Sequence, residues 1–216
     1  MEAAAVRLPP ARSTCGAEKG AIVRRLKQAR PGDALLFTDW TLLRLFPPLR
    51  ASWAQVGQQA VVPITGRNAR RVLFCALNVC TGHRVVAHAQ HAGGPEAQAF
   101  LGEIRRRYRH APTIWLLLDR APAHVDLRTQ ALAARLRIEL VWLPKQWSEL
   151  NAVDQLWREL KRLLAANRQP ATIEEMAERC TRWIHGLTPH DVLLKAGVLS
   201  PRFWLRGVMH CFCGPT

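Results

Sequence analysis

The sequence predicts an α/β protein in which helices cover the faces of a sheet. Along the second half of the chain, short apolar runs of strand length alternate with stretches of helical periodicity. No repeat or low-complexity tract interrupts this order. Hydrophobic residues make up 49% of the 216 residues, which is enough for a sizeable core within one domain.

Strands dominate the first half of the chain. Pro31-Gly32-Asp33 predicts a turn before the first strand, and Thr81-Gly82 predicts a hairpin between the next two. The expected elements are a basic helix at 17–30, an apolar strand at 34–38, an irregular stretch at 40–57 broken by Pro47-Pro48, and strands at 70–79 and 84–90.

Helices and strands alternate in the second half. Asn151 is typical of a helix N-cap, and Thr172 with Glu175 has the spacing of a capping box. The expected elements are a helix at 96–108, a strand at 113–118, a helix at 126–134, a strand at 138–143, a loop at 144–150, and helices at 152–166, at about 172–186 and from 188.

The charge balance indicates a polyanionic partner. Thirty-one Lys and Arg stand against 16 Asp and Glu, a formal net charge of +15, so nucleic acid is the leading partner and an anionic membrane surface the second. No apolar run approaches the ~20 residues of a membrane span, and the N-terminus has no apolar signal segment. We therefore expect a cytoplasmic protein whose six cysteines are reduced thiols.

Three of the six aspartates have no evident structural role. Asp33, Asp126 and Asp191 are explained by a turn or a helix start. The other three are Asp39 and Asp119, each at the end of an apolar strand, and Asp154 in the first turn of a helix. Strand ends are where α/β folds place ligand-binding groups.

The position of Asp154 has two interpretations. It shares a helix face with Arg158 and Lys161 at spacings of four and seven residues. The ordinary reading is an ion pair on a solvated surface. The alternative is a metal ligand beside two cations that bind phosphate. Three carboxylates gathered in a basic protein would repel one another, and two Mg²⁺ (or Mn²⁺) ions would relieve that repulsion and serve phosphodiester chemistry.

Three segments resemble the catalytic domain of insertion-sequence transposases of the mariner-related group, in the DDE superfamily. They are LLFTDWTLLRLFPPLRASWAQVGQQ (35–59), LLLDRAPAH (116–124) and LVWLPKQWSELNAVDQLWRELKR (140–162). Between Asp119 and Asp154 lie 34 residues, the spacing of that group. The resemblance implies an RNase H-like mixed sheet flanked by helices. We expect a lead at 1–32, a catalytic domain at 33–205 and a tail at 206–216.

The resemblance also implies a site and an activity. Asp39, Asp119 and Asp154 match the three catalytic acids that hold two metal ions, His124 and Asn151 match residues beside them, and Trp53 and Gly57 match a segment after the first acid. Arg158 and Lys161 are candidates for DNA contacts. The implied reaction is metal-dependent cleavage at element ends, followed by attack of a 3′-hydroxyl on target DNA. A homodimer at the bacterial nucleoid is also implied.

Several residues depart from the family pattern. They are Trp40 after the first acid, Arg120 after the second, and Trp147, Ser148 and Ala152 before the third. About 30 residues precede the expected sheet, too few for the family's helix-turn-helix modules, so a separately encoded helix-turn-helix protein or a truncated copy is expected. Two alternatives remain: an inactive DNA-binding remnant, and an RNase H-like nuclease acting on RNA or a hybrid.

Overall fold

The computed structural model describes residues 12–47, 51, 53–59, 61–64, 66, 68–167 and 169–213. The first eleven residues of the expected lead, and Pro48 in the expected irregular stretch, lie outside this part. The strands are β1 (Ala34–Arg44), β2 (Arg70–Asn78), β3 (Arg84–Ala89), β4 (Ile114–Leu118) and β5 (Ile138–Trp142). The helices are α1 (Arg12–Leu26), α2 (Gly94–Arg107), α3 (Pro122–Val125), α4 (Leu127–Arg135), α5 (Ala152–Leu160), α6 (Ile173–Gly186), α7 (Pro189–Lys195) and α8 (His210–Cys213).

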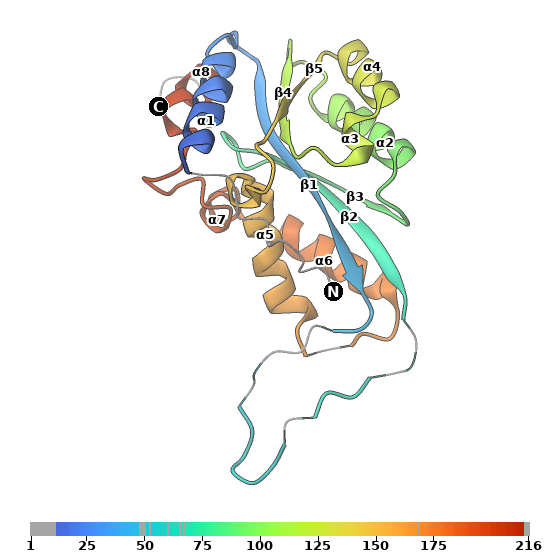
Figure 1. Ribbon diagram of the computed structural model, residues 1–216. Helices are drawn as coiled ribbons and strands as arrows, with labels where there is room; N and C mark the ends of the chain where they lie inside the picture. The colour runs from blue at the N-terminus through green and yellow to red at the C-terminus, as the bar shows by residue number, and fades with distance from the viewer. Residues whose placement is uncertain are drawn as a thin grey trace, which may run out of the picture.

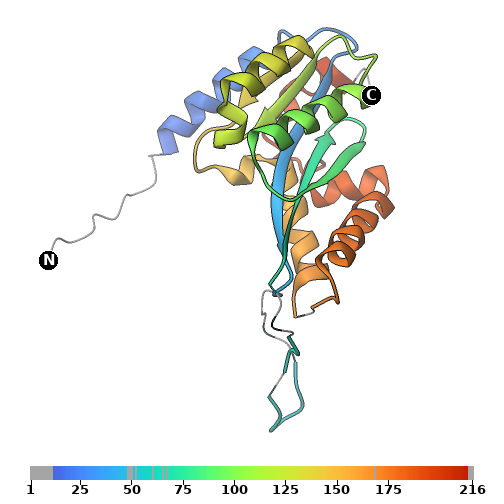
Figure 2. The same cartoon turned by 90° about the vertical axis from the view of Figure 1, so that its right-hand side faces the viewer.

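The sheet is mixed, which confirms the predicted α/β class. Its five strands run in the order β3-β2-β1-β4-β5; β1, β2 and β3 pair antiparallel, whereas β1, β4 and β5 pair parallel. Helices α2, α3 and α4 lie on one side of the sheet, and α1, α5, α6 and α7 lie on the other (Figures 1 and 2). The protein therefore has three layers.

Alternation of side chains along the strands builds one core on each face of the sheet. On β1, Leu35 and Phe37 join the core under α5 and α6, while Leu36 joins the core under α2 and α4. All three side chains are 0% exposed. A strand buried on both faces reads as a continuous apolar run, and such runs made the sheet predictable.

Strand β1 is longer than the sequence predicts. It pairs with β4 only from Ala34 to Phe37, but its pairing with β2 continues as far as Arg44. Asp39 therefore lies within β1, opposite Cys75 of β2, and not at a strand end. The prediction failed because the apolar run stops at Asp39, whereas alternate burial continues through Thr41 and Leu43.

The segment after β1 extends away from the sheet where it is described (Figures 1 and 2). Trp53 is 103% exposed, and Gly57 has a φ of 83°. Neither residue contacts the sheet in this structure, so the matched Trp and Gly of the family pattern lie apart from the three aspartates.

The helix starts predicted at Asp126, Asn151 and Thr172 are confirmed, whereas the helix expected at 17–30 spans Arg12–Leu26. The side chains of Asp126, Asn151 and Thr172 accept hydrogen bonds from the backbone N–H groups of Thr129, Val153 and Glu175. The helix expected at 152–166 is divided: α5 ends at Leu160, and one π-helical turn, Lys161–Ala165, follows it.

The hairpin between β2 and β3 is also confirmed, and its turn lies against α7. Gly82 has a φ of 68°, a left-handed conformation that favours glycine. A Cβ at this position would lie 2.6 Å from the carbonyl oxygen of Pro189. The glycine is required both by the turn and by the approach of the α7 start.

The expected boundaries at 33 and 205 stay predictions, but the core crosses both. Ile22 and Leu26 of α1 pack into the core with exposures of 7% and 0%, and Val208 packs there at 0%. Helix α1 also binds β5, because Arg25 donates to the carbonyl of Leu140 and pairs with Glu139. No helix in the described ranges is long and apolar enough to cross a membrane.

The expectation of six reduced thiols is wrong at two positions. Cys80, in the turn after β2, forms a disulfide with Cys213 of α8, with 5.1 Å between the Cα atoms. Cys75, Cys180 and Cys211 are free thiols. Cys80 and Cys213 are 133 residues apart in sequence, and only the packing of α8 brings them together, so cysteine spacing gave no sign of this bond.

We predict that Cys213→Ser lowers the free energy of unfolding by about 2–4 kcal/mol, because the reduced chain gains conformational entropy when unfolded. Urea denaturation without reductant measures the change. Cys211→Ser removes a neighbouring free thiol and should leave the midpoint unchanged. A wild-type protein in which all six thiols react with a thiol reagent after unfolding without reductant would contradict the bond.

Candidate active site

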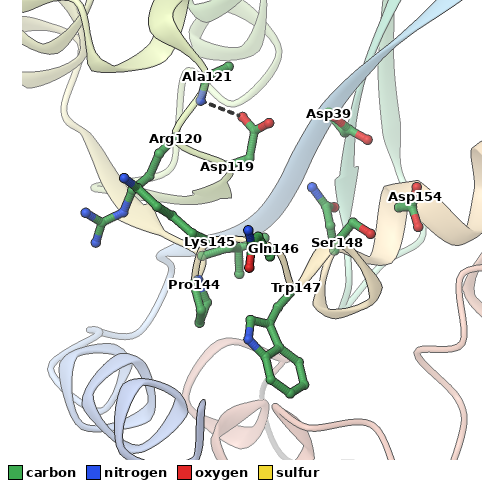
Figure 3. A pocket seen from close by; sticks show the side chains of 12 residues that line it. Asp39, Asp119, Arg120, Ala121, Pro144, Lys145, Gln146, Trp147, Ser148 and Asp154 are labelled. Carbon is green, nitrogen blue, oxygen red and sulfur yellow. Dashed lines mark hydrogen bonds between the residues drawn. The ribbon is translucent and has the colours of Figure 1, made fainter. Parts of the chain in front are cut away.

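Asp39, Asp119 and Asp154 line one cavity of about 380 Å³ (Figure 3). They come from three elements: β1, the end of β4 and the first turn of α5. Residues 120–121, residues 143–148 and Asn151 form the remaining walls. The structure thus brings together the three aspartates that have no structural role in the sequence.

The parallel pairing of β1 with β4 places the first two acids level with each other along the strand direction. Phe37 pairs with Leu117, and Asp39 and Asp119 each lie two residues further along. Because side chains alternate along a strand, Asp39 projects to the same face as Phe37, the face that α5 covers. Asp119 follows the last residue of β4 directly, at the carboxyl edge of the parallel strands.

Asn151 connects the third acid to β1. Its Oδ1 accepts a hydrogen bond from the N–H of Val153 at 3.0 Å, and its Nδ2 donates to the carbonyl oxygen of Thr38 at 2.9 Å. The residue is 4% exposed. One side chain therefore caps α5 and attaches its first turn beside Asp39, so that Asp154 reaches the cavity.

Asp119 is held in its charged form. His124 Nδ1 lies 2.8 Å from Asp119 Oδ1. The N–H of Ala121 donates to the same oxygen at 3.2 Å (Figure 3). The hydrogen bond with His124 is the main reason that the pKa of Asp119 is lowered. His124 is 6% exposed, because the short helix α3 returns it beneath the carboxylate.

The pKa of Asp39 is shifted in the opposite direction to that of Asp119. Burial is the main cause that raises its pKa from 3.8 to about 7, and the charges of Asp119 and Asp154 raise it further. The N–H of Trp40 opposes this shift by donating a hydrogen bond. A carboxyl group with this pKa is stabilised in its charged form by a cation beside it.

Asp154 is occupied by a neighbour on its own helix. Arg158 donates to Asp154 Oδ2 from Nε at 3.1 Å and from Nη2 at 2.8 Å. Within the described ranges, no three His, Cys, Asp or Glu side chains stand close enough together to hold a metal ion. The carboxylates thus share a cavity, and their donor chemistry suits Mg²⁺ or Mn²⁺, but Asp154 would have to turn away from Arg158 to complete a metal site.

The two cations expected to contact DNA do not line this cavity. Arg158 pairs with Asp154 and lines a neighbouring hollow with Arg162 and Lys195. Lys161 begins the π-helical turn after α5. The spacing of four residues between Asp154 and Arg158 suits an intrahelical ion pair, which is one of the two interpretations that the sequence allowed.

Two cationic residues that line the cavity are not predicted from the sequence. Arg120 was noted only as a departure from the family pattern, and Lys145 was not singled out. Both line the cavity with the three acids. Arg120 adjoins Asp119, and Lys145 follows the strand beside β4, so the rule that strand carboxyl edges carry ligand-binding groups could have identified them.

The unusual tryptophans pack against the core. Trp40 is partly buried against the core under α2 and α4, and Trp147 against the opposite core. Lys19 of α1 lies 5.7 Å from the centroid of the Trp147 ring, within the range of a cation–π contact. This contact places α1 beside the loop that forms one wall of the cavity.

The fold and the three carboxylates define a class, and a family model confirms it: the chain belongs to the DDE superfamily endonucleases, matching over residues 34–177. Among curated proteins, it is 24% identical over 170 residues to the insertion element IS630 uncharacterized 39 kDa protein of Shigella sonnei. The match covers 78% of this chain. The chain spans about half the length of that relative.

Solved structures share the fold. The catalytic domain of Mos1 mariner transposase superposes with a TM-score of 0.61 at 14% identity, covering 95% of this chain and 97% of that one. The Mos1 paired-end complex with Mn gives 0.66 at 13% identity, covering 96% of this chain and 66% of the other. The RNase H-like fold expected from the sequence is confirmed.

We predict that ionisation of Asp39 destabilises the metal-free protein. Its pKa is about 7 in the folded protein, against the ordinary value of 3.8 that applies to the unfolded chain. The folded state therefore binds the proton more tightly, and the free energy of unfolding should fall as the pH rises from about 4 to about 7. Asp39→Asn should remove this part of the decline in the free energy of unfolding. We expect a contribution on the order of 2 kcal/mol, smaller than the full pKa shift would give, because solvent in the cavity screens the charge.

Urea denaturation from pH 4 to pH 8 in EDTA tests this prediction. Glu149→Gln, an exposed change in the loop before α5, serves as the control and should follow the wild-type curve. Wild-type and Asp39→Asn curves that stay parallel over this range would contradict the raised pKa.

We also predict that Asn151→Ala lowers the free energy of unfolding by about 1–3 kcal/mol, because the helix cap and the bond to the Thr38 carbonyl are both lost. Asn151→Ser keeps an oxygen for the cap but has no amide to reach Thr38, so it should recover only part of the loss. Full recovery by serine in urea denaturation would show that the contact with β1 contributes nothing.

Proposed function

We propose that this chain is the catalytic domain of a transposase that cleaves DNA strands at insertion-sequence ends and transfers them to target DNA. One observation carries the proposal: Asp39, Asp119 and Asp154 line a single cavity on an RNase H-like sheet. Membership of the DDE superfamily endonucleases supports it.

Divalent metal is part of the proposal. Asp39, Asp119 and Asp154 would hold two Mg²⁺ or Mn²⁺ ions. Such a pair of ions activates a water or hydroxyl nucleophile and stabilises the leaving oxygen of a phosphodiester. Mos1 mariner paired-end complexes are known with Mn and with Mg, which supports the choice of metals.

The residues around the acids have separate tasks. His124 keeps Asp119 oriented and charged through the bond to Oδ1. Asn151 keeps the start of α5 against β1, so the distance between Asp154 and Asp39 depends on it. Arg158 pairs with Asp154 and would have to release it for Asp154 to bind a metal ion.

The substrate and partners follow from charge and from the structural relatives. A net charge of +15 suits a DNA backbone. Mos1 transposase is known in a complex with the left transposon end and in a strand transfer complex. We extend this to a homodimer that acts on element ends and target DNA at the bacterial nucleoid, with a separately encoded helix-turn-helix protein reading the end sequence.

We predict that the wild-type protein nicks a supercoiled plasmid carrying element ends when Mg²⁺ or Mn²⁺ is present, and that EDTA abolishes the nicking. Asp119→Asn should reduce it to the level of the EDTA control, because an amide replaces a charged metal ligand. Gel electrophoresis of the plasmid measures both.

Glu149→Gln is the matched control, since it removes one exposed carboxylate near the cavity without touching the three acids; it should nick as the wild type does. Equal nicking by wild type and Asp119→Asn, or none by either, contradicts the proposal, and the second result favours an inactive DNA-binding remnant. Preferential cutting of an RNA–DNA hybrid would instead favour an RNase H-like nuclease.

A further inference from the structure

The acidic cavity carries two cations that no acid neutralises. Arg120 and Lys145 both line it and are exposed. Their side chains form no ion pair or hydrogen bond with any residue whose placement is described. Cations elsewhere in the described ranges have acidic partners: Arg25 pairs with Glu139, Arg158 with Asp154, and Arg162 with Glu159.

The sheet brings these two cations to the same edge. Arg120 follows Asp119 after β4, and Lys145 follows β5 by three residues. Strands β4 and β5 are parallel neighbours, with Leu118 paired to Trp142, so both segments leave the sheet at the carboxyl edge. In the view of Figure 3, Arg120 and Lys145 lie on the Asp119 side of the cavity, and Asp154 lies across from them.

The loop that carries Lys145 has a defined shape. Pro144 is buried, Gln146 adopts a left-handed conformation with a φ of 65°, and Trp147 packs against the core. A non-glycine residue keeps such a conformation only where its surroundings hold it there. Lys145 therefore lines the cavity between Pro144, which is buried, and Trp147, which packs against the core.

Arg120 and Lys145 form an ion pair with none of the three acids, and two of these acids already have other partners. Asp119 already accepts hydrogen bonds from His124 and Ala121, and Asp154 accepts two from Arg158. A guanidinium binds two oxygens of a phosphate through its planar fork, and an ammonium adds a point charge. The arrangement therefore suits an anion that enters the cavity from outside.

We propose that Arg120 and Lys145 form a phosphate-binding subsite that holds the backbone of a DNA strand beside the three acids. The identity of the ligand as DNA rests on the proposed function; the subsite itself rests on the two unpaired cations. Arg158 differs from these two cations because it pairs with Asp154 and does not line the cavity.

DNA binding in EDTA tests the subsite without any cleavage. Fluorescence polarisation of a labelled duplex is measured against salt concentration for wild type and for Arg120→Gln/Lys145→Gln. Loss of two phosphate contacts should weaken binding roughly 50-fold at about 0.1 M salt and reduce the salt slope by about 2. Urea midpoints confirm that each variant folds.

The matched control is Arg109→Gln/Arg135→Gln, which changes the net charge equally. Both residues are exposed. Arg109 lies two residues after α2, and Arg135 is the last residue of α4, so both are near the amino ends of β4 and β5 and far from Asp119. This pair should change the affinity much less. Equal losses for both double variants would overturn the subsite, since only overall charge would then matter.

The plasmid-nicking assay on the same proteins separates the two proposals. If Asp119-dependent nicking is present and both double variants bind DNA equally, the subsite is wrong and the transposase function stands. If the Arg120 and Lys145 variant alone loses binding while wild type does not nick under any metal condition, the subsite stands and the catalytic function is wrong.

Discussion

The parallel pairing of β1 with β4 is the constraint on which the candidate site depends. It sets Asp39 and Asp119 at equal height, because each lies two residues beyond the pair Phe37 and Leu117. The third acid is placed by a second link, the hydrogen bond from Asn151 to the carbonyl of Thr38, which attaches the start of α5 to the same strand. Strand β1 is thus the common reference for all three carboxylates.

A different interaction determines the charge state or pairing of each carboxylate in the cavity. His124 stabilises the charged form of Asp119, burial favours the protonated form of Asp39, and Arg158 pairs with Asp154. Three carboxylates can share a small volume because one is hydrogen-bonded to a histidine, one favours its protonated form and one is paired with an arginine. The basic surface around them adds attraction for polyanions on a longer range.

The sequence predicted those features that local chemistry decides. Apolar runs revealed the strands, and the side chains of Asp126, Asn151 and Thr172 marked helix starts because each can bond its own backbone. The elimination of structurally explained aspartates, together with the family pattern, identified the three acids that line the cavity. What could not be predicted depends on contacts between distant segments: the extension of β1 along β2 past Asp39 and the burial of α1.

The bond between Cys80 and Cys213 belongs to the same category of distant contacts, and it has a topological consequence. It closes a covalent ring that contains Asp119 and Asp154 and every element from β3 to α8, whereas β1 with Asp39 lies outside the ring. A single backbone cut anywhere between the two cysteines would therefore leave both fragments joined. The candidate active site is assembled from one acid on an open length of chain and two on a closed loop.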